Sequence, residues 1–316
     1  MRKLLLFISC TILFVACTFT SDTSPFYFNQ GHIEDTLNHY EQAIEYYTIA
    51  INKNSYHPEY YLNRGIDEEH IGKFKSAIND YNKVLQTKSY EAMAYNDRGL
   101  AEHDSASSLF SESLRDYDSA IKINPEWTIA YCNRAELESD MGFYQRDSSK
   151  YLFAMKDLDK SLALDSKNYW AYCNRGLLNH RLGKYPEALG DFNIAISLNP
   201  DIGEFYTDRG VTYMSLHKDS LAKASFIKAL KLSPRIAYNN LGFFDYTHGN
   251  YLEGKEYYNK LLTIDSSNGQ AYLTRGLIEL KLNEHEEACQ DFYRALKHHD
   301  AVAQEKIDSF CTDTKH

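Results

Sequence analysis

The sequence repeats itself with a spacing of 32 to 41 residues, and most copies are 34 residues apart. In every copy a tyrosine stands four residues before a small residue, which is glycine in all copies except one. The small residues are Gly31, Gly65, Gly99, Ala135, Gly176, Gly210, Gly242 and Gly276. Self-similarity at such a period is typical of proteins in which one small structural unit stacks on the next.

The second half of each copy predicts a helix. A small residue is followed after four positions by a bulky one, and after three more by another mostly small residue, so all three lie on one helical face. The bulky residues are Tyr47, Tyr81, Tyr117, Leu158, Phe192, Phe226, Tyr258 and Phe292. A glycine inside a helix costs about 1 kcal/mol relative to alanine. We therefore expect that it lets two helices approach closely, with the bulky side chain filling the groove between them.

These residues resemble the tetratricopeptide repeat family over residues 24–302. The resemblance implies an all-α, right-handed superhelical solenoid of about eight helix-turn-helix repeats. The expected repeats are 24–57, 58–91, 92–127, 128–168, 169–202, 203–234, 235–268 and 269–302. Residues 303–316 are expected to form a capping helix and a tail, with Ala303, Ile307 and Phe310 along one stripe.

The N-terminal residues indicate an export signal. Arg2 and Lys3 precede an apolar run that ends at Ala16, which is too short to span a bilayer. The run ends in Leu-Phe-Val-Ala-Cys and resembles the lipobox of bacterial lipoproteins, although Phe14 stands where Leu, Val or Ile is usual. We expect a signal peptide at 1–16, a lipid on Cys17 and a tether at 17–23. The alternatives are an ordinary signal peptide with a chance cysteine, and an uncleaved leader on a cytoplasmic adaptor.

The remaining cysteines give no metal-binding pattern, since none lies in a CxxC or Cys/His spacing. Cys132 and Cys173 occupy equivalent places in adjacent repeats and are expected to be too far apart to bridge. Cys289 and Cys311 form either a disulfide at the C-terminal end or two buried thiols, and the thiols are the favoured interpretation.

Arginine and aspartate occur together in most repeats. The arginine stands just before the small residue, and the aspartate lies on the second helix. The pairs are Arg64 with Asp80, Arg98 with Asp116, Arg134 with Asp157, Arg175 with Asp191, and Arg275 with Asp291. Where the arginine is missing, at Gln30 and Leu241, the aspartate is missing too, while Arg209 has Ser225. This pattern favours structural ion pairs, within a repeat or between neighbours, over arginines that bind a ligand.

Members of this family usually bind partners along their first helices. Early repeats offer polar residues there, among them Asp35, Glu69 and Asp104, whereas late repeats offer apolar ones. The candidate groove residues are Trp170, Leu177, Val211, Met214, Phe243 and Tyr246. We expect an apolar peptide or helix to bind them, with Trp170, Met214 and Tyr246 as anchors. The alternative is that several of them, with Leu277 and Leu280, pack against neighbouring helices.

The fourth repeat has about seven extra residues, which are expected in a turn. They include Phe143, Tyr144 and Arg146, a candidate contact patch, although a tolerated insertion is the favoured interpretation.

No phosphate-binding loop, nucleophile elbow or HExxH motif is present. We therefore expect no enzyme, cofactor or metal. The net charge of −10 and the lack of a Lys/Arg cluster argue against nucleic-acid binding. The sequence predicts a membrane-anchored envelope lipoprotein, periplasmic or surface-facing, that binds a protein or peptide in its concave groove. The alternative is a carbohydrate-binding, nutrient-capture lipoprotein using Trp127, Trp170, Phe143 and Tyr144.

Overall fold

The computed structural model describes residues 22–105 and 110–311, and within these ranges every regular element is an α-helix. The predicted all-α fold is confirmed. The chain divides into two compact units at Glu112 and Ser113. The predicted signal peptide, Cys17 and most of the tether lie outside the described residues, as does the predicted tail from 312 to 316.

Unit one contains helices that pack as consecutive pairs, α1 with α2 and α3 with α4. The first helix of each pair lies in the first half of a predicted repeat, and the second helix in the second half. Its helices are α1 (Ser24–Thr36), α2 (Tyr40–Lys53), α3 (Pro58–His70), α4 (Phe74–Leu85), α5 (Glu91–Ser105) and the beginning of α6 (Phe110–Ile123).

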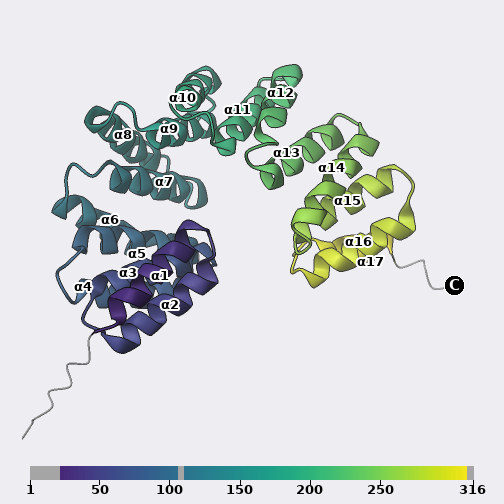
Figure 1. The fold of residues 1–316 in the computed structure, drawn as a ribbon. Helices are drawn as coiled ribbons and strands as arrows, with labels where there is room; N and C mark the ends of the chain where they lie inside the picture. The colour runs from purple at the N-terminus through teal and green to yellow at the C-terminus, as the bar shows by residue number, and fades with distance from the viewer. Residues whose placement is uncertain (1–21, 106–109, 312–316) are drawn as a thin grey trace, which may run out of the picture. The chain divides into compact units, whose positions relative to one another are not determined.

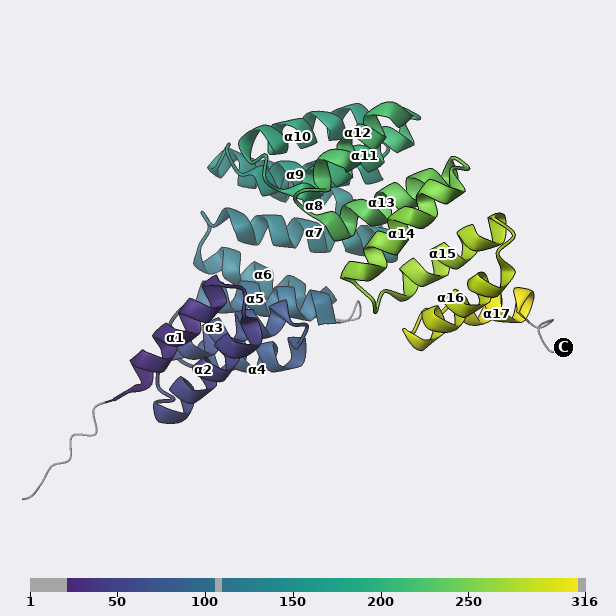
Figure 2. The ribbon, with the colours of Figure 1, turned by 45° about the vertical axis from the view of Figure 1, so that its right-hand side comes forward.

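Unit two continues from α6 with five further pairs and a terminal helix. The pairs are α7 (Thr128–Tyr144) with α8 (Ser149–Leu164), α9 (Tyr169–Arg181) with α10 (Tyr185–Leu198), α11 (Gly203–Ser215) with α12 (Asp219–Ala229), α13 (Pro234–Thr247) with α14 (Tyr251–Ile264), and α15 (Gly269–Lys281) with α16 (His285–Lys297). The terminal helix is α17 (Ala303–Phe310). Figure 2 shows the pairs of unit two following one another along the stack.

In six repeats the glycine of the first helix lies against an aromatic ring of the second helix. A Cβ atom added to Gly176 would lie only 2.8 Å from a ring carbon of Phe192. The same close contact joins Gly31 to Tyr47, Gly65 to Tyr81, Gly210 to Phe226, Gly242 to Tyr258 and Gly276 to Phe292. These rings are fully or almost fully buried. Burying a large side chain contributes about 1.5–3 kcal/mol, which offsets the cost of the helical glycine.

A second position, seven residues after the glycine, ends the first helix. In six repeats its residue has a left-handed backbone, with φ between +54° and +77°: Asn38, Gly72, Gly183, His217, Gly249 and Asn283. This conformation is the usual helix C-terminus, and it favours glycine or asparagine because other L-residues are strained there.

The fourth repeat was expected to carry its extra residues in a turn, and this prediction was wrong. The residues instead lengthen both helices, so α7 has 17 residues and α8 has 16, against 13 and 14 in α9 and α10. The first helix gains four residues, the second gains two and the connection between them gains one, so the seven residues are about two helical turns in all and the packing register is kept. Near the end of α7, Gly142 makes a second glycine–aromatic contact with α8. A Cβ atom added to Gly142 would lie 2.7 Å from a ring carbon of Tyr151.

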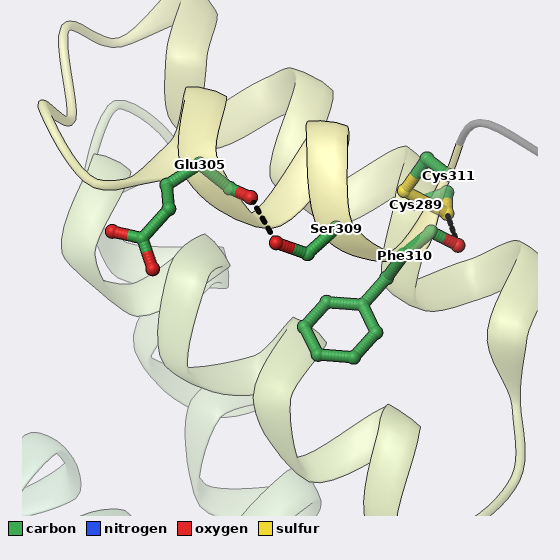
Figure 3. The surroundings of a disulfide bond; sticks show 5 residues. All are labelled: Cys289, Glu305, Ser309, Phe310 and Cys311. Atoms are coloured by element: carbon green, nitrogen blue, oxygen red, sulfur yellow. Dashed lines mark hydrogen bonds between the residues drawn. A yellow bond between two sulfur atoms is a disulfide. The ribbon is translucent and has the colours of Figure 1, made fainter.

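The C-terminal end is closed by α17 and a disulfide (Figure 3). Cys289 of α16 is bonded to Cys311, which directly follows α17, so the favoured interpretation of two buried thiols was wrong. Ala303 and Ile307 are buried as expected, whereas Phe310 at the end of the stripe is 48% exposed. The bond holds the last turn of α17 beside α16, and this leaves the ring of Phe310 outside the core. Cys132 and Cys173 are free and buried.

Two glycines of the fifth repeat provide a matched test of these backbone requirements. Neither Gly183 nor Gly190 has any atom within 4 Å of an added Cβ, but Gly183 has φ +72° and Gly190 lies inside α10. We expect Gly183→Ala to lower the free energy of unfolding by about 1 kcal/mol or more, because alanine is strained in the left-handed region. Gly190→Ala should raise it by about 1 kcal/mol, because alanine favours the helix.

Urea unfolding of both variants measures the two effects. Equal effects of the same sign would contradict the assignment of Gly183 as a helix-ending residue.

Candidate functional site

The first helices of unit two form a continuous surface. Consecutive members of α7, α9, α11, α13 and α15 contact one another, and Figure 1 shows them on the inner side of the curve of this unit. Leu177, Val211 and Phe243 each directly follow the repeat glycine, and they are 38%, 36% and 47% exposed. We call these three residues the apolar row. Beside Leu177, a pocket of about 40 Å³ lies between α7 and α9.

The other predicted groove residues are more engaged in packing. Met214 packs against the core that contains Phe226 and Phe244, and Tyr246 packs against the core around Tyr258. Both are half-buried, so they are poorly placed to act as the main anchors. Trp170 remains 46% exposed, but its ring makes an edge contact with the buried Phe205 of the next repeat, with the centroids 5.3 Å apart.

The apolar row ends where the terminal helix begins. Leu277 occupies the same repeat position as the row, yet it is half-buried. Leu277 and Leu280 pack against the core that Leu273 and Phe292 form with Ile307 of α17. The alternative interpretation of Leu277 and Leu280 as packing residues is therefore the correct one.

The structure places the arginine and aspartate of four predicted pairs in direct contact. In repeat five, Nη2 of Arg175 donates to Oδ1 of Asp191 at 2.8 Å, and Nε donates to Oδ2 at 3.1 Å. Arg64 with Asp80, Arg134 with Asp157 and Arg275 with Asp291 form the same two-pronged contact. The aspartates are buried, and a buried carboxylate needs such a partner.

Each arginine also reaches back to the preceding repeat. Its Nη1 donates to a polar side chain sixteen residues earlier, on the previous second helix. The acceptors are Thr48 for Arg64, Asn82 for Arg98, Asp118 for Arg134, Asp159 for Arg175, Asn193 for Arg209 and Asn259 for Arg275. The guanidinium lies over the ring of the tyrosine three residues before it, with 5.4 to 5.8 Å between Cζ and the ring centroid. One arginine therefore joins three helices.

This backward contact was missed in the sequence, although the sequence carries a signal for it. The acceptor position is polar before every repeat that has the arginine. Before the seventh repeat, which has Leu241 in place of arginine, the equivalent residue is Ile227, two residues after Ser225 as Asn193 is two residues after Asp191. It stands fourteen residues before Leu241 because this spacing is two residues shorter than usual. In the seventh repeat a lysine, not an arginine, lies over the tyrosine rings. The Nζ atom of Lys260 (α14) is 6.0 Å from the ring centroid of Tyr238 and 5.6 Å from that of Tyr257. The arginines are thus committed to holding the repeats together.

The candidate patch of the fourth repeat lies at one end of the lengthened helices. Phe143 and Tyr144 are in the last turn of α7 and are 61% and 63% exposed, and Arg146 follows in the connection to α8. Arg181 of α9 stacks over Phe143 at 5.9 Å. Trp127 lies at the opposite end of α7, about 24 Å away at 1.5 Å per residue. The four aromatic residues considered for carbohydrate binding are therefore not gathered into one platform.

Unit one presents carboxylates on its first helices. We call Asp35 of α1, Asp67 and Glu69 of α3, and Asp97 and Asp104 of α5 the acidic cluster. Burial, and then the neighbouring Asp35, raise the pKa of Asp67 to about 8. Burial, with Asp97 and Asp104 nearby, raises the pKa of Glu69 to about 8 even though Tyr81 donates a hydrogen bond to it. Burial raises the pKa of Asp97 to about 6.

In the described parts of the chain, no group of three or more His, Cys, Asp or Glu side chains could hold a metal ion. Among these same residues, no helix combines the length and apolarity that crossing a bilayer requires.

Comparisons with known proteins agree with the fold. Models of the tetratricopeptide repeat match residues 24–52, 169–202, 203–236 and 245–305, together half of the chain. The human tetratricopeptide repeat protein 6 is 28% identical over 123 residues, which is 37% of this chain and only 24% of that protein.

Two solved structures are similar in fold. A tetratricopeptide repeat protein from Parabacteroides merdae is 20% identical, with a TM-score of 0.56 over 92% of this chain and 99% of that one. Yeast Tom70 is 18% identical, with a TM-score of 0.68 over 92% of this chain and 63% of that one.

The ion pair of the fifth repeat can be tested by a double-mutant cycle. Arg175→Ala and Asp191→Ala should each destabilise the protein, because each leaves a partner charge unpaired. The double variant should lose less than their sum, with a coupling of about 1–2 kcal/mol. The same cycle at Arg209 and Ser225, where the contact is a single bond of 3.3 Å to a neutral hydroxyl, should give a clearly smaller coupling. Additive effects at Arg175 and Asp191 would contradict the pairing.

The acidic cluster predicts a pH dependence of stability. Near pH 6 the folded Asp67 and Glu69 hold protons that the unfolded chain has lost, since their pKa values are raised to about 8. The free energy of unfolding should therefore fall as the pH rises from 5.5 to 8.5, by at least about 1 kcal/mol. Thermal melting at both pH values tests this. Asp67→Asn with Glu69→Gln should flatten the dependence, and the exposed Glu256→Gln should leave it unchanged.

Proposed function

Because this chain belongs to the tetratricopeptide repeat family, we propose that it is a protein-binding scaffold of the bacterial cell envelope. The fold is typical of protein–protein interaction scaffolds. The proposed partner is a protein or peptide that lies along the first helices of unit two. The proposed anchor is a lipid on Cys17, which would hold the scaffold at a membrane on its periplasmic or surface side.

The observation that carries the binding proposal is the apolar row. Leu177, Val211 and Phe243 expose apolar side chains at one repeat position on adjacent first helices. They recur at the spacing of the repeats, so an extended peptide or a helix face could contact them in succession. The arginine contacts fix the helices before a partner arrives. A preformed surface loses little conformational entropy on binding.

The disulfide supports the proposed location. A bond between Cys289 and Cys311 persists in an oxidising compartment, whereas cytosolic thiols are generally kept reduced. This agrees with export by the leader at 1–16. Membrane attachment would in turn raise the local concentration of the scaffold near envelope partners.

The binding proposal predicts that the apolar row is needed to capture a partner. The tagged chain is crosslinked in its own membranes, and the copurified proteins are identified by mass spectrometry. The triple variant Leu177→Ser, Val211→Ser and Phe243→Ser should recover a specific partner at least about tenfold less well, because central apolar anchors dominate binding energy.

The matched control changes three exposed apolar residues of second helices, Leu221→Ser, Leu252→Ser and Ile264→Ser. It should capture the partner as the unchanged chain does. If the groove variant also retains the partner, the apolar row is not the binding surface. If no protein is captured by any form, the scaffold proposal fails.

The anchor is tested separately by Cys17→Ser. Without the sulfur that would carry the lipid, the protein should move from the membrane fraction to the soluble fraction, as followed by immunoblotting. Unchanged retention in the membrane fraction would refute lipidation at this residue.

A further inference from the structure

The acidic cluster of unit one has no cationic partner within the described part of the chain. None of its five carboxylates forms an ion pair with a lysine, arginine or histidine among the described residues. This contrasts with the buried aspartates of the second helices, such as Asp80 of the same unit, which is held by Arg64. The repeats therefore pair buried aspartates of the second helices with arginines, but they provide no such cation for the acidic cluster.

Asp67 is the most confined member of the cluster. It is 1% exposed, its Oδ2 has no hydrogen-bond partner, and its carboxyl group faces that of Asp35 from the neighbouring repeat. The hydroxyl of Tyr47, which is coupled electrostatically to both, is likewise buried without a partner. A buried polar group without a partner costs about 1–3 kcal/mol. Asp67 and Asp35 hydrogen-bond to each other through their carboxyl groups, so the site holds two facing carboxyls, and neither forms an ion pair with a cation in the described part of the chain.

Glu69 has the same deficiency on the side that faces α5. Its Oε2 accepts a hydrogen bond from Tyr81 at 2.7 Å, but its Oε1 is buried and unpartnered. Asp35, Asp97 and Asp104 lie near the buried Asp67 or the half-buried Glu69 and keep contact with solvent. They give an incoming cation a solvent-accessible approach to the unpartnered oxygens.

We propose that the acidic cluster binds lysine or arginine side chains of a partner polypeptide. An ammonium group offers three donors and a guanidinium five, and either would satisfy oxygens that the protein leaves open. A lysine or arginine stem can pass along a protein surface while only the charged head is held. The carboxylates belong to three successive first helices, which suits several basic side chains of one extended segment better than a single small cation.

This inference rests on the proposed scaffold function, and it names the chemistry of a partner segment at a surface separate from the apolar row. Burial raises the pKa of Asp67 and of Glu69, so their ionised forms are disfavoured in the free protein. Binding of a basic segment gives these carboxyl groups a function. A bound basic segment would stabilise the ionised form, because opposite charges attract strongly where water is partly excluded.

The test uses the full chain and a fluorescein-labelled eight-residue peptide that alternates lysine with serine. Fluorescence anisotropy should show binding that weakens as salt is raised, since the contact is electrostatic. The peptide that alternates glutamate with serine should not bind. Asp67→Asn with Glu69→Gln should weaken binding of the lysine peptide by at least about tenfold, as expected for losing two charge-assisted contacts.

The control variant, Glu253→Gln with Glu256→Gln on α14, replaces the same number of carboxyl groups at exposed positions in unit two and should bind the lysine peptide normally. Because the cluster substitutions remove carboxylates that are costly to bury, the variant should melt no lower than the unchanged protein, so unfolding would not explain a loss. Equal binding by the cluster variant, or by the glutamate peptide, would overturn the proposal. If the lysine peptide does not bind but a partner is still captured through the apolar row, this inference fails while the scaffold function stands.

Discussion

In six repeats the arginine before the repeat glycine, or before Ala135 in the fourth, links the repeat to the one before it. Arg275 shows the arrangement. Its Nε and Nη2 atoms donate hydrogen bonds to Asp291 on the second helix of the same repeat, and its Nη1 atom donates to Asn259 on the second helix of the preceding repeat. The glycine–aromatic contact sets how closely the two helices of a repeat approach, and the arginine sets how that pair sits on its neighbour. Together they fix the first helices side by side, which is what a preformed binding surface requires.

The two units present different chemistry on equivalent helices. In unit two the position after the glycine carries the apolar row, which suits a partner that buries apolar side chains. In unit one the first helices carry the acidic cluster, which suits a basic segment.

Much of this architecture could be predicted from the sequence because the repeats act as an alignment within one chain. Co-occurrence revealed the contact of Arg175 with Asp191, and the same reasoning applied to Ile227 and Leu241 would have revealed the backward contacts. Other features depend on three-dimensional placement. The bond between Cys289 and Cys311 requires α17 to lie along α16, which spacing alone does not determine. The extra residues near Gly142 were expected in a turn, but most of them lengthen α7 and α8, and an addition of about two helical turns in total keeps the packing.

The most direct test of the central role of the arginine is hydrogen exchange of Arg275→Leu, followed by mass spectrometry. The substitution keeps the helix and removes the contacts to both second helices. We expect faster exchange in α16, which loses the partner of Asp291, and also in α14, which loses the contact at Asn259. Faster exchange in α16 alone, with α14 unchanged, would contradict the claim that this arginine couples one repeat to the next.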